Sequence, residues 1–129
     1  MRFAKVVFWI AAIWGLLAIT PLFFIFDVIG RQDPPPITHP LFYYGFASVA
    51  LAWQFAFMVI ATDPVRFRPM MLPSILEKFG YAVAALAVYL HRGVKAGDLV
   101  FGGVDLLLGL LFVGAFLKTK AGKQLTTAL

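Results

Sequence analysis

Residues 98–117 read Asp-Leu-Val-Phe-Gly-Gly-Val-Asp-Leu-Leu-Leu-Gly-Leu-Leu-Phe-Val-Gly-Ala-Phe-Leu, and this stretch decides the fold. A helix of this length crosses the hydrocarbon core of a bilayer, which takes about 20 apolar residues. The stretch nevertheless contains a carboxylate, Asp105, two helical turns after its start. An ionisable group at that depth costs roughly 2.5–3.5 kcal/mol on insertion scales. We therefore expect Asp105 to face other helices of the chain and not lipid.

The composition is that of a membrane protein. Of the 129 residues, 62% are hydrophobic and 13% are charged, whereas soluble domains carry roughly 25% charged residues. Cysteine is absent, which excludes disulfides and thiolate metal sites. The net charge of +5 does not indicate nucleic-acid binding, because the basic residues lie at the ends of apolar segments instead of on one patch. Anionic lipid headgroups are the expected partner.

Hydropathy predicts an all-α, integral membrane four-helix bundle that forms a single domain over residues 1–129. The expected spans are residues 6–29, 41–61, 74–91 and 98–117. Proline-rich segments separate the first three spans, since proline cannot donate a backbone hydrogen bond inside a helix.

Several residues are expected to mark where helices bend, begin or end. Pro21 predicts a kink in the first span, and Gly30 predicts its stop in a left-handed conformation. Ser74 and Glu77 have the spacing of a capping box, which predicts that the third span begins at Ser74. Asp98 is the expected N-cap of the fourth span.

The distribution of lysine and arginine predicts the orientation. Eight basic residues flank the spans on the side of the two termini and the middle loop, against three on the other side. Cytoplasmic loops carry the excess of basic residues, so both termini are expected in the cytoplasm. The expected headgroup or docking residues on this side include Arg66, Arg68, Lys78 and Lys118.

A buried polar cluster is expected around Asp105. Gly102 and Gly109 share its helical face and allow a neighbouring backbone to approach closely. Matching the outer ends of the last two spans places Asp105 near the level of Tyr81. Gln54 and Trp53 of the second span complete the expected cluster. Asp105 then either fixes the helix register, takes a proton, ion or ligand, or pairs with a cation of a partner subunit.

The sequence offers little for catalysis or for a cofactor. It contains no catalytic triad, no phosphate-binding glycine loop and no zinc-protease motif. His39 and His91 are weak candidates for metal or haem ligands, because both are expected at the outer edge of the membrane and not on facing mid-helix positions. We therefore expect no enzyme, no metal and no cofactor.

Residues 76–90 (LEKFGYAVAALAVYL) and 104–112 (VDLLLGLLF) resemble the DoxX-like small membrane proteins of bacteria. The resemblance covers the last two spans and implies a four-helix membrane protein, in a family some of whose members are linked to redox or quinone pathways. We transfer no functional residue from it.

The expected function is that of a non-enzymatic accessory or structural subunit of the bacterial inner membrane, which docks to a larger membrane complex or self-associates. The alternative is a small carrier or proton-linked membrane protein that uses Asp105. A second alternative is a redox protein that binds haem or quinone.

Overall fold

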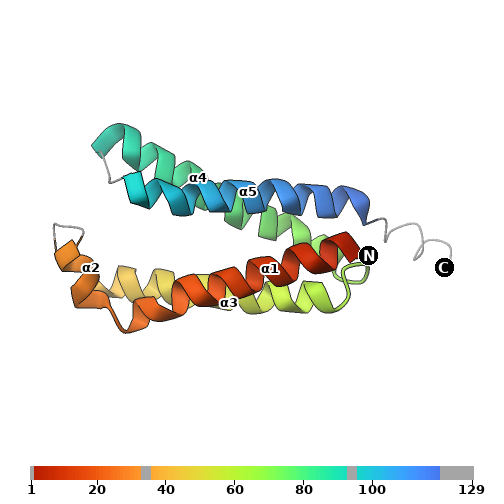
Figure 1. Ribbon diagram of the computed structural model, residues 1–129, viewed down its shortest axis with the longest axis horizontal. Helices are drawn as coiled ribbons and strands as arrows, with labels where there is room; N and C mark the ends of the chain where they lie inside the picture. Colours follow the sequence, from red (N-terminus) through yellow and green to blue (C-terminus); the bar gives the residue numbers. More distant parts are fainter. Residues whose placement is uncertain (1, 33–35, 93–95, 120–129) are drawn as a thin grey trace.

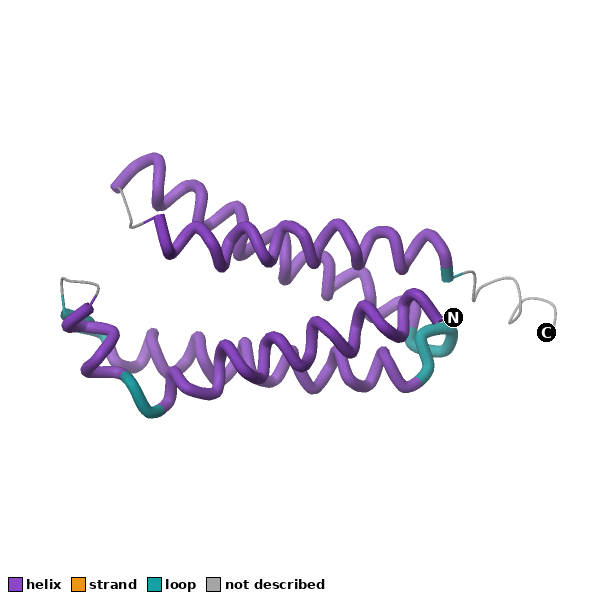
Figure 2. The backbone as a smooth tube through the Cα atoms, in the orientation of Figure 1, coloured by secondary structure: helices purple, strands orange, loops and turns teal. Residues whose placement is uncertain are grey.

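The computed structural model describes residues 2–32, 36–92 and 96–119, and this part of the chain is helical, with no strand (Figures 1 and 2). Five α-helices form: α1 (Arg2–Ile19), α2 (Phe26–Gln32), α3 (Pro40–Thr62), α4 (Met71–Arg92) and α5 (Ala96–Lys118). Two short 3-10 helices, η1 (Thr20–Phe23) and η2 (Arg68–Met70), precede α2 and α4. Four segments are long and apolar enough to cross a membrane: Arg2–Phe23, Pro40–Thr62, Arg68–His91 and Leu99–Lys118.

The first span is shorter than predicted, and Pro21 is the reason. The α-helix ends at Ile19, and Pro21 lies in the 3-10 turn η1, where its missing amide costs least. The amide of Phe24 then donates to the carbonyl of Pro21 at 2.9 Å, which closes the turn. The prediction that Gly30 stops the helix is wrong, because Gly30 is buried inside α2.

The third span begins earlier than predicted, and the capping box is wrong. Proline is tolerated in the first turn of a helix, whose amides have no intrahelical acceptor, so Pro73 does not prevent α4 from starting at Met71. Ser74 is thus inside the helix, where its hydroxyl donates to the carbonyl of Met70 at 2.8 Å. Asp98 is not an N-cap either, since α5 already begins at Ala96; its side chain lies outside the described part.

The helices form two antiparallel pairs. Helix α1 lies along α3, α4 lies along α5, and the pairs meet mainly through α1 and α5 (Figures 1 and 2). The start of α1, the α3–α4 connection and the end of α5 lie together, and we call this the terminal end (Figure 1). Helix α2 lies at the opposite end, the α2 end.

Three phenylalanines close the terminal end of the bundle. The ring of Phe112 stacks on Phe8 at a centroid distance of 4.2 Å and meets the edge of Phe57 at 5.1 Å. All three side chains are fully buried. Small side chains surround them and let the helices approach, as is typical where lipid removes the hydrophobic driving force between helices. These are Ala4, Ala11, Ala12, Ala61 and Ala115.

Replacing Phe112 with alanine leaves a void between Phe8 and Phe57, so Phe112→Ala is expected to lower the free energy of unfolding by about 3 kcal/mol. The matched control is Leu107→Ala on the same helix, at a side chain that is 57% exposed, and we expect a change within about 0.5 kcal/mol. Reversible unfolding in mixed micelles of dodecyl sulfate and maltoside measures both. If both variants lose the same free energy of unfolding, Phe112 is not part of a tightly packed core.

Candidate functional site

A cavity of about 860 Å³ lies where the two helix pairs separate, from mid-bundle to the α2 end. Its walls are aromatic and aliphatic, and its charged groups lie at mid-bundle, on the side where the tight core begins. The aromatic residues of the wall are Trp14, Phe46, Trp53, Tyr81 and Phe101. The polar residues are Gln32, Gln54, Glu77, Lys78 and Asp105. Mostly apolar walls with a few convergent polar groups are typical of a small-molecule site.

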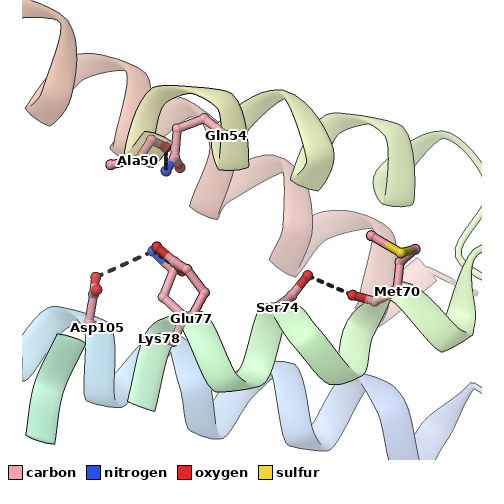
Figure 3. Close-up of polar contacts among 7 residues, drawn as sticks. All are labelled: Ala50, Gln54, Met70, Ser74, Glu77, Lys78 and Asp105. Carbon is pink, nitrogen blue, oxygen red and sulfur yellow. Dashed lines mark hydrogen bonds and ion pairs between the residues drawn. The ribbon is translucent and has the colours of Figure 1, made fainter. Parts of the chain in front are cut away.

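Lys78 is the centre of the polar group. Its side chain is only 3% exposed, and its ammonium donates to Asp105 Oδ1 at 3.3 Å (Figure 3). The same ammonium lies 3.6 Å from Glu77 Oε2, which is an ion pair but too long for a hydrogen bond. It also lies 5.1 Å from the ring centroid of Phe57 on α3, within the range of a cation–π contact. One side chain thus links α4 to α5 and α3.

The prediction that Lys78 reaches the cytoplasmic headgroups is therefore wrong. The span begins at Arg68, so Lys78 is ten residues inside it, at a depth of about 15 Å with 1.5 Å of rise per residue. For a helix that crosses a hydrocarbon core about 30 Å thick, that depth is the middle, beyond the reach of a lysine to either surface. A lysine at this depth must be paired, and Asp105 is the pair.

Two glycines let α5 bring Asp105 to Lys78. A Cβ added at Gly102 would lie 3.1 Å from the Cβ of Ala85, and one added at Gly109 would lie 3.0 Å from the ring of Phe79. The close approach predicted from these glycines is thus confirmed. The two contacts also place Asp105 opposite the segment between Phe79 and Ala85, as the predicted register has it.

Gln54 is the polar group that α3 contributes, and its side chain is 2% exposed. Its Nε2 donates to the carbonyl of Ala50 at 2.7 Å, while its Oε1 is buried without a hydrogen-bond partner. Gly15 on α1 makes room for this amide, because a Cβ at that position would overlap Oε1. Figure 3 shows the amide end of Gln54 directed toward the side of the cavity where Lys78 and Asp105 lie.

The structure brings together all four residues of the predicted polar cluster, since Asp105, Tyr81, Gln54 and Trp53 line one cavity. It adds Lys78 and Glu77, which the sequence analysis placed elsewhere. The helical spacing of the sequence could have predicted the position of Lys78. It lies four residues after Ser74 and three before Tyr81, so the three side chains share one face of the helix. Glu77 does not cap the helix; its carboxylate faces the ammonium of Lys78.

The other predicted docking residues lie at the terminal end. Arg68 donates from Nε to the carbonyl of Phe116 at 3.0 Å, and its guanidinium lies 3.6 Å from the centroid of that ring. It satisfies one of the free carbonyls in the last turn of α5, which is a structural role. Arg66 and Lys118 are exposed, and Lys118 lies over the ring of Phe3 at 4.3 Å. The last two remain available to lipid headgroups.

The two histidines do not join the cavity. His39 precedes α3 and His91 lies near the end of α4, and both are exposed. Within the described residues, no three histidine, aspartate or glutamate side chains gather as metal ligands do.

No protein family, curated protein or solved structure matches this chain. The resemblance to DoxX-like proteins gains no support from these comparisons, and the site is interpreted from its own geometry.

We expect Lys78→Met to destabilise the protein more than Asp105→Asn does. Without Lys78, two carboxyls share a buried site with no cation, and breaking a buried pair in this way costs about 3–5 kcal/mol. Without the Asp105 charge, Lys78 still has Glu77 as its counter-ion. The free energy of unfolding in mixed micelles shows which of the two variants is less stable. Lys118→Met is the control at an exposed lysine. If Asp105→Asn costs as much as Lys78→Met, Glu77 does not act as a counter-ion.

Proposed function

We propose that this chain is a non-enzymatic, multi-pass protein of the bacterial cytoplasmic membrane that binds a small amphipathic molecule in its cavity, as a carrier or binding protein does. The observation that carries the proposal is the cavity of about 860 Å³ with aromatic walls and a buried group of charges on one side. A bundle built only to span the membrane gains nothing from such a void, because each unfilled space gives up packing contacts. The charged groups bind one another and provide no base with a nucleophile, which favours binding over catalysis.

The cavity gives the carrier alternative more support than the accessory-subunit expectation. A second candidate nevertheless keeps the accessory role: a helix of a partner protein, or of a second copy of this chain, fills the space between the helix pairs. The observation that favours it is the separation of α3 and α4, which touch little although they are consecutive. The exposed Arg66 and Lys118 at the terminal end would then contact lipid or the partner.

Gly45 offers a direct test of the cavity. It lines the cavity, and a Cβ added there meets no atom within 4 Å, so Gly45→Leu fills space without disturbing the backbone. Gly103→Leu is the matched control, because Gly103 is equally open, is exposed and lies outside the cavity. Protein purified from native membranes is analysed by native mass spectrometry. We expect a small-molecule adduct on the wild type and on Gly103→Leu that is lost from Gly45→Leu.

A polypeptide partner in place of the adduct, lost in the same variant, would support the second candidate. If Gly45→Leu and Gly103→Leu behave alike, both proposals are contradicted.

The proposed orientation places the terminal end in the cytoplasm and the α2 end outside. The excess of basic residues near the terminal end supports it, and it does not depend on Lys78, which is buried. Because the chain has no cysteine, single substitutions report the topology cleanly. In intact cells, a membrane-impermeant maleimide is expected to label Thr38→Cys, before α3, and to label Asp63→Cys only after permeabilisation. If Asp63→Cys is labelled in intact cells and Thr38→Cys only after permeabilisation, the proposed orientation is wrong.

A further inference from the structure

The charges of the cavity do not balance. The ammonium of Lys78 and the carboxylate of Asp105 form a hydrogen-bonded ion pair at 3.3 Å. Glu77 is a second carboxylate beside the same ammonium, with its side chain 18% exposed and its buried Oε2 without a hydrogen-bond partner. When all three groups are ionised, the described wall of the cavity carries one negative charge in excess. An uncompensated charge in a membrane interior is costly, so an occupant with one positive charge complements the site.

Gln54 adds a neutral hydrogen-bond acceptor to this excess negative charge. Its Oε1 is buried without a partner, and Figure 3 shows its amide end turned toward the charged group. The orientation of the amide is fixed by Ala50, whose carbonyl can accept only from Nε2. Glu77 and Gln54 thus each have a buried oxygen without a hydrogen-bond donor, and both residues line the cavity, where a donor or cation from a ligand would complement them.

The walls suit the apolar part of such a ligand. Trp14 and Trp53 line the cavity from α1 and α3, and tryptophan is the aromatic side chain with the strongest attraction for a cation. Phe101 and Tyr81 line it from α5 and α4. A volume of about 860 Å³ is within the range of sites that enclose molecules of drug size.

We propose that the ligand of this cavity is an amphipathic organic monocation, with its positive group beside Glu77 and Gln54 and its apolar body between the aromatic side chains. The Lys78–Asp105 pair stays intact, and Glu77 is the counter-ion of the ligand. This inference rests on the proposed function of the cavity as a binding site, and it names the class of molecule that binds.

The test compares two ions of nearly the same shape and opposite charge, tetraphenylphosphonium and tetraphenylborate. Each is titrated by calorimetry into the full-length protein in a neutral maltoside detergent, and only binding that Gly45→Leu abolishes is counted as binding in the cavity. We expect saturable binding of the cation at least tenfold tighter than that of the anion. Glu77→Gln is expected to weaken the cation at least tenfold, and Glu77→Asp, which keeps the charge, to retain most of the affinity.

Asp63→Asn is the control for net charge, because Asp63 is an exposed carboxylate in the α3–α4 connection, and it is expected to change neither affinity. The comparison of the two ions on the wild type needs no variant at position 77, so it remains decisive if Glu77→Gln does not fold.

Equal or tighter binding of the anion overturns the cation proposal, and so does cation affinity that Glu77→Gln leaves unchanged. If binding is blocked by Gly45→Leu but is indifferent to charge, the cavity remains a binding site and only the class of ligand is wrong. If neither ion shows binding that Gly45→Leu blocks, the cation proposal fails, while co-purification from native membranes still judges the cavity itself.

Discussion

The ion pair between Lys78 and Asp105 is the interaction on which the arrangement of this bundle depends. Each group alone would be expensive in hydrocarbon, so each needs the other on a neighbouring helix. The pair fixes how α4 lies against α5, and the glycines at 102 and 109 make the required approach possible. The contact of the ammonium with the ring of Phe57 extends the constraint to α3. Changing the register of α4 against α5 would separate the two charges.

The same pair lies at the boundary between two different halves of the molecule. Toward the terminal end, phenylalanine rings and alanines form a buried core around Phe8 and Phe112. Toward the α2 end, the pairs of helices diverge (Figure 2), and Trp14 and Trp53 line the cavity between them. Dense packing in one half supplies the stability that lets the other half remain open, which is how a small bundle can hold a site.

The sequence alone predicted four spans and a sheltered Asp105, because hydropathy and the cost of a buried charge are strong, local constraints. It misplaced the helix ends at Pro21 and Ser74. Proline stops a helix interior but is tolerated in a first turn, and the sequence does not show which turn a proline occupies. That error of a few residues carried into the site. A span that starts at Ser74 predicts Lys78 close to the surface, whereas the start at Arg68 places it ten residues inside the span.

The partners of Asp105 were predicted only in part for a related reason. Tyr81, Gln54 and Trp53 were found because the level of each residue follows from its distance to a span end, and that level depends little on the exact boundary. Which face a residue takes is a different matter, since an error of one residue rotates it by about 100° around a helix of 3.6 residues per turn. Lys78 and Glu77 are adjacent, so only tertiary packing decides that both turn toward the cavity.

A pair of opposite charges is enough to fix two helices, and here the chain carries a third charge. Glu77 adds no further link between elements, because it comes from the same helix as Lys78, which already pairs with Asp105. A second carboxyl in a low-dielectric site repels the first, while the ammonium of Lys78 attracts both. The carboxylate of Glu77 lies 3.6 Å from the ammonium of Lys78 and also lines the cavity with aromatic walls, so a cation bound there would offset the repulsion further.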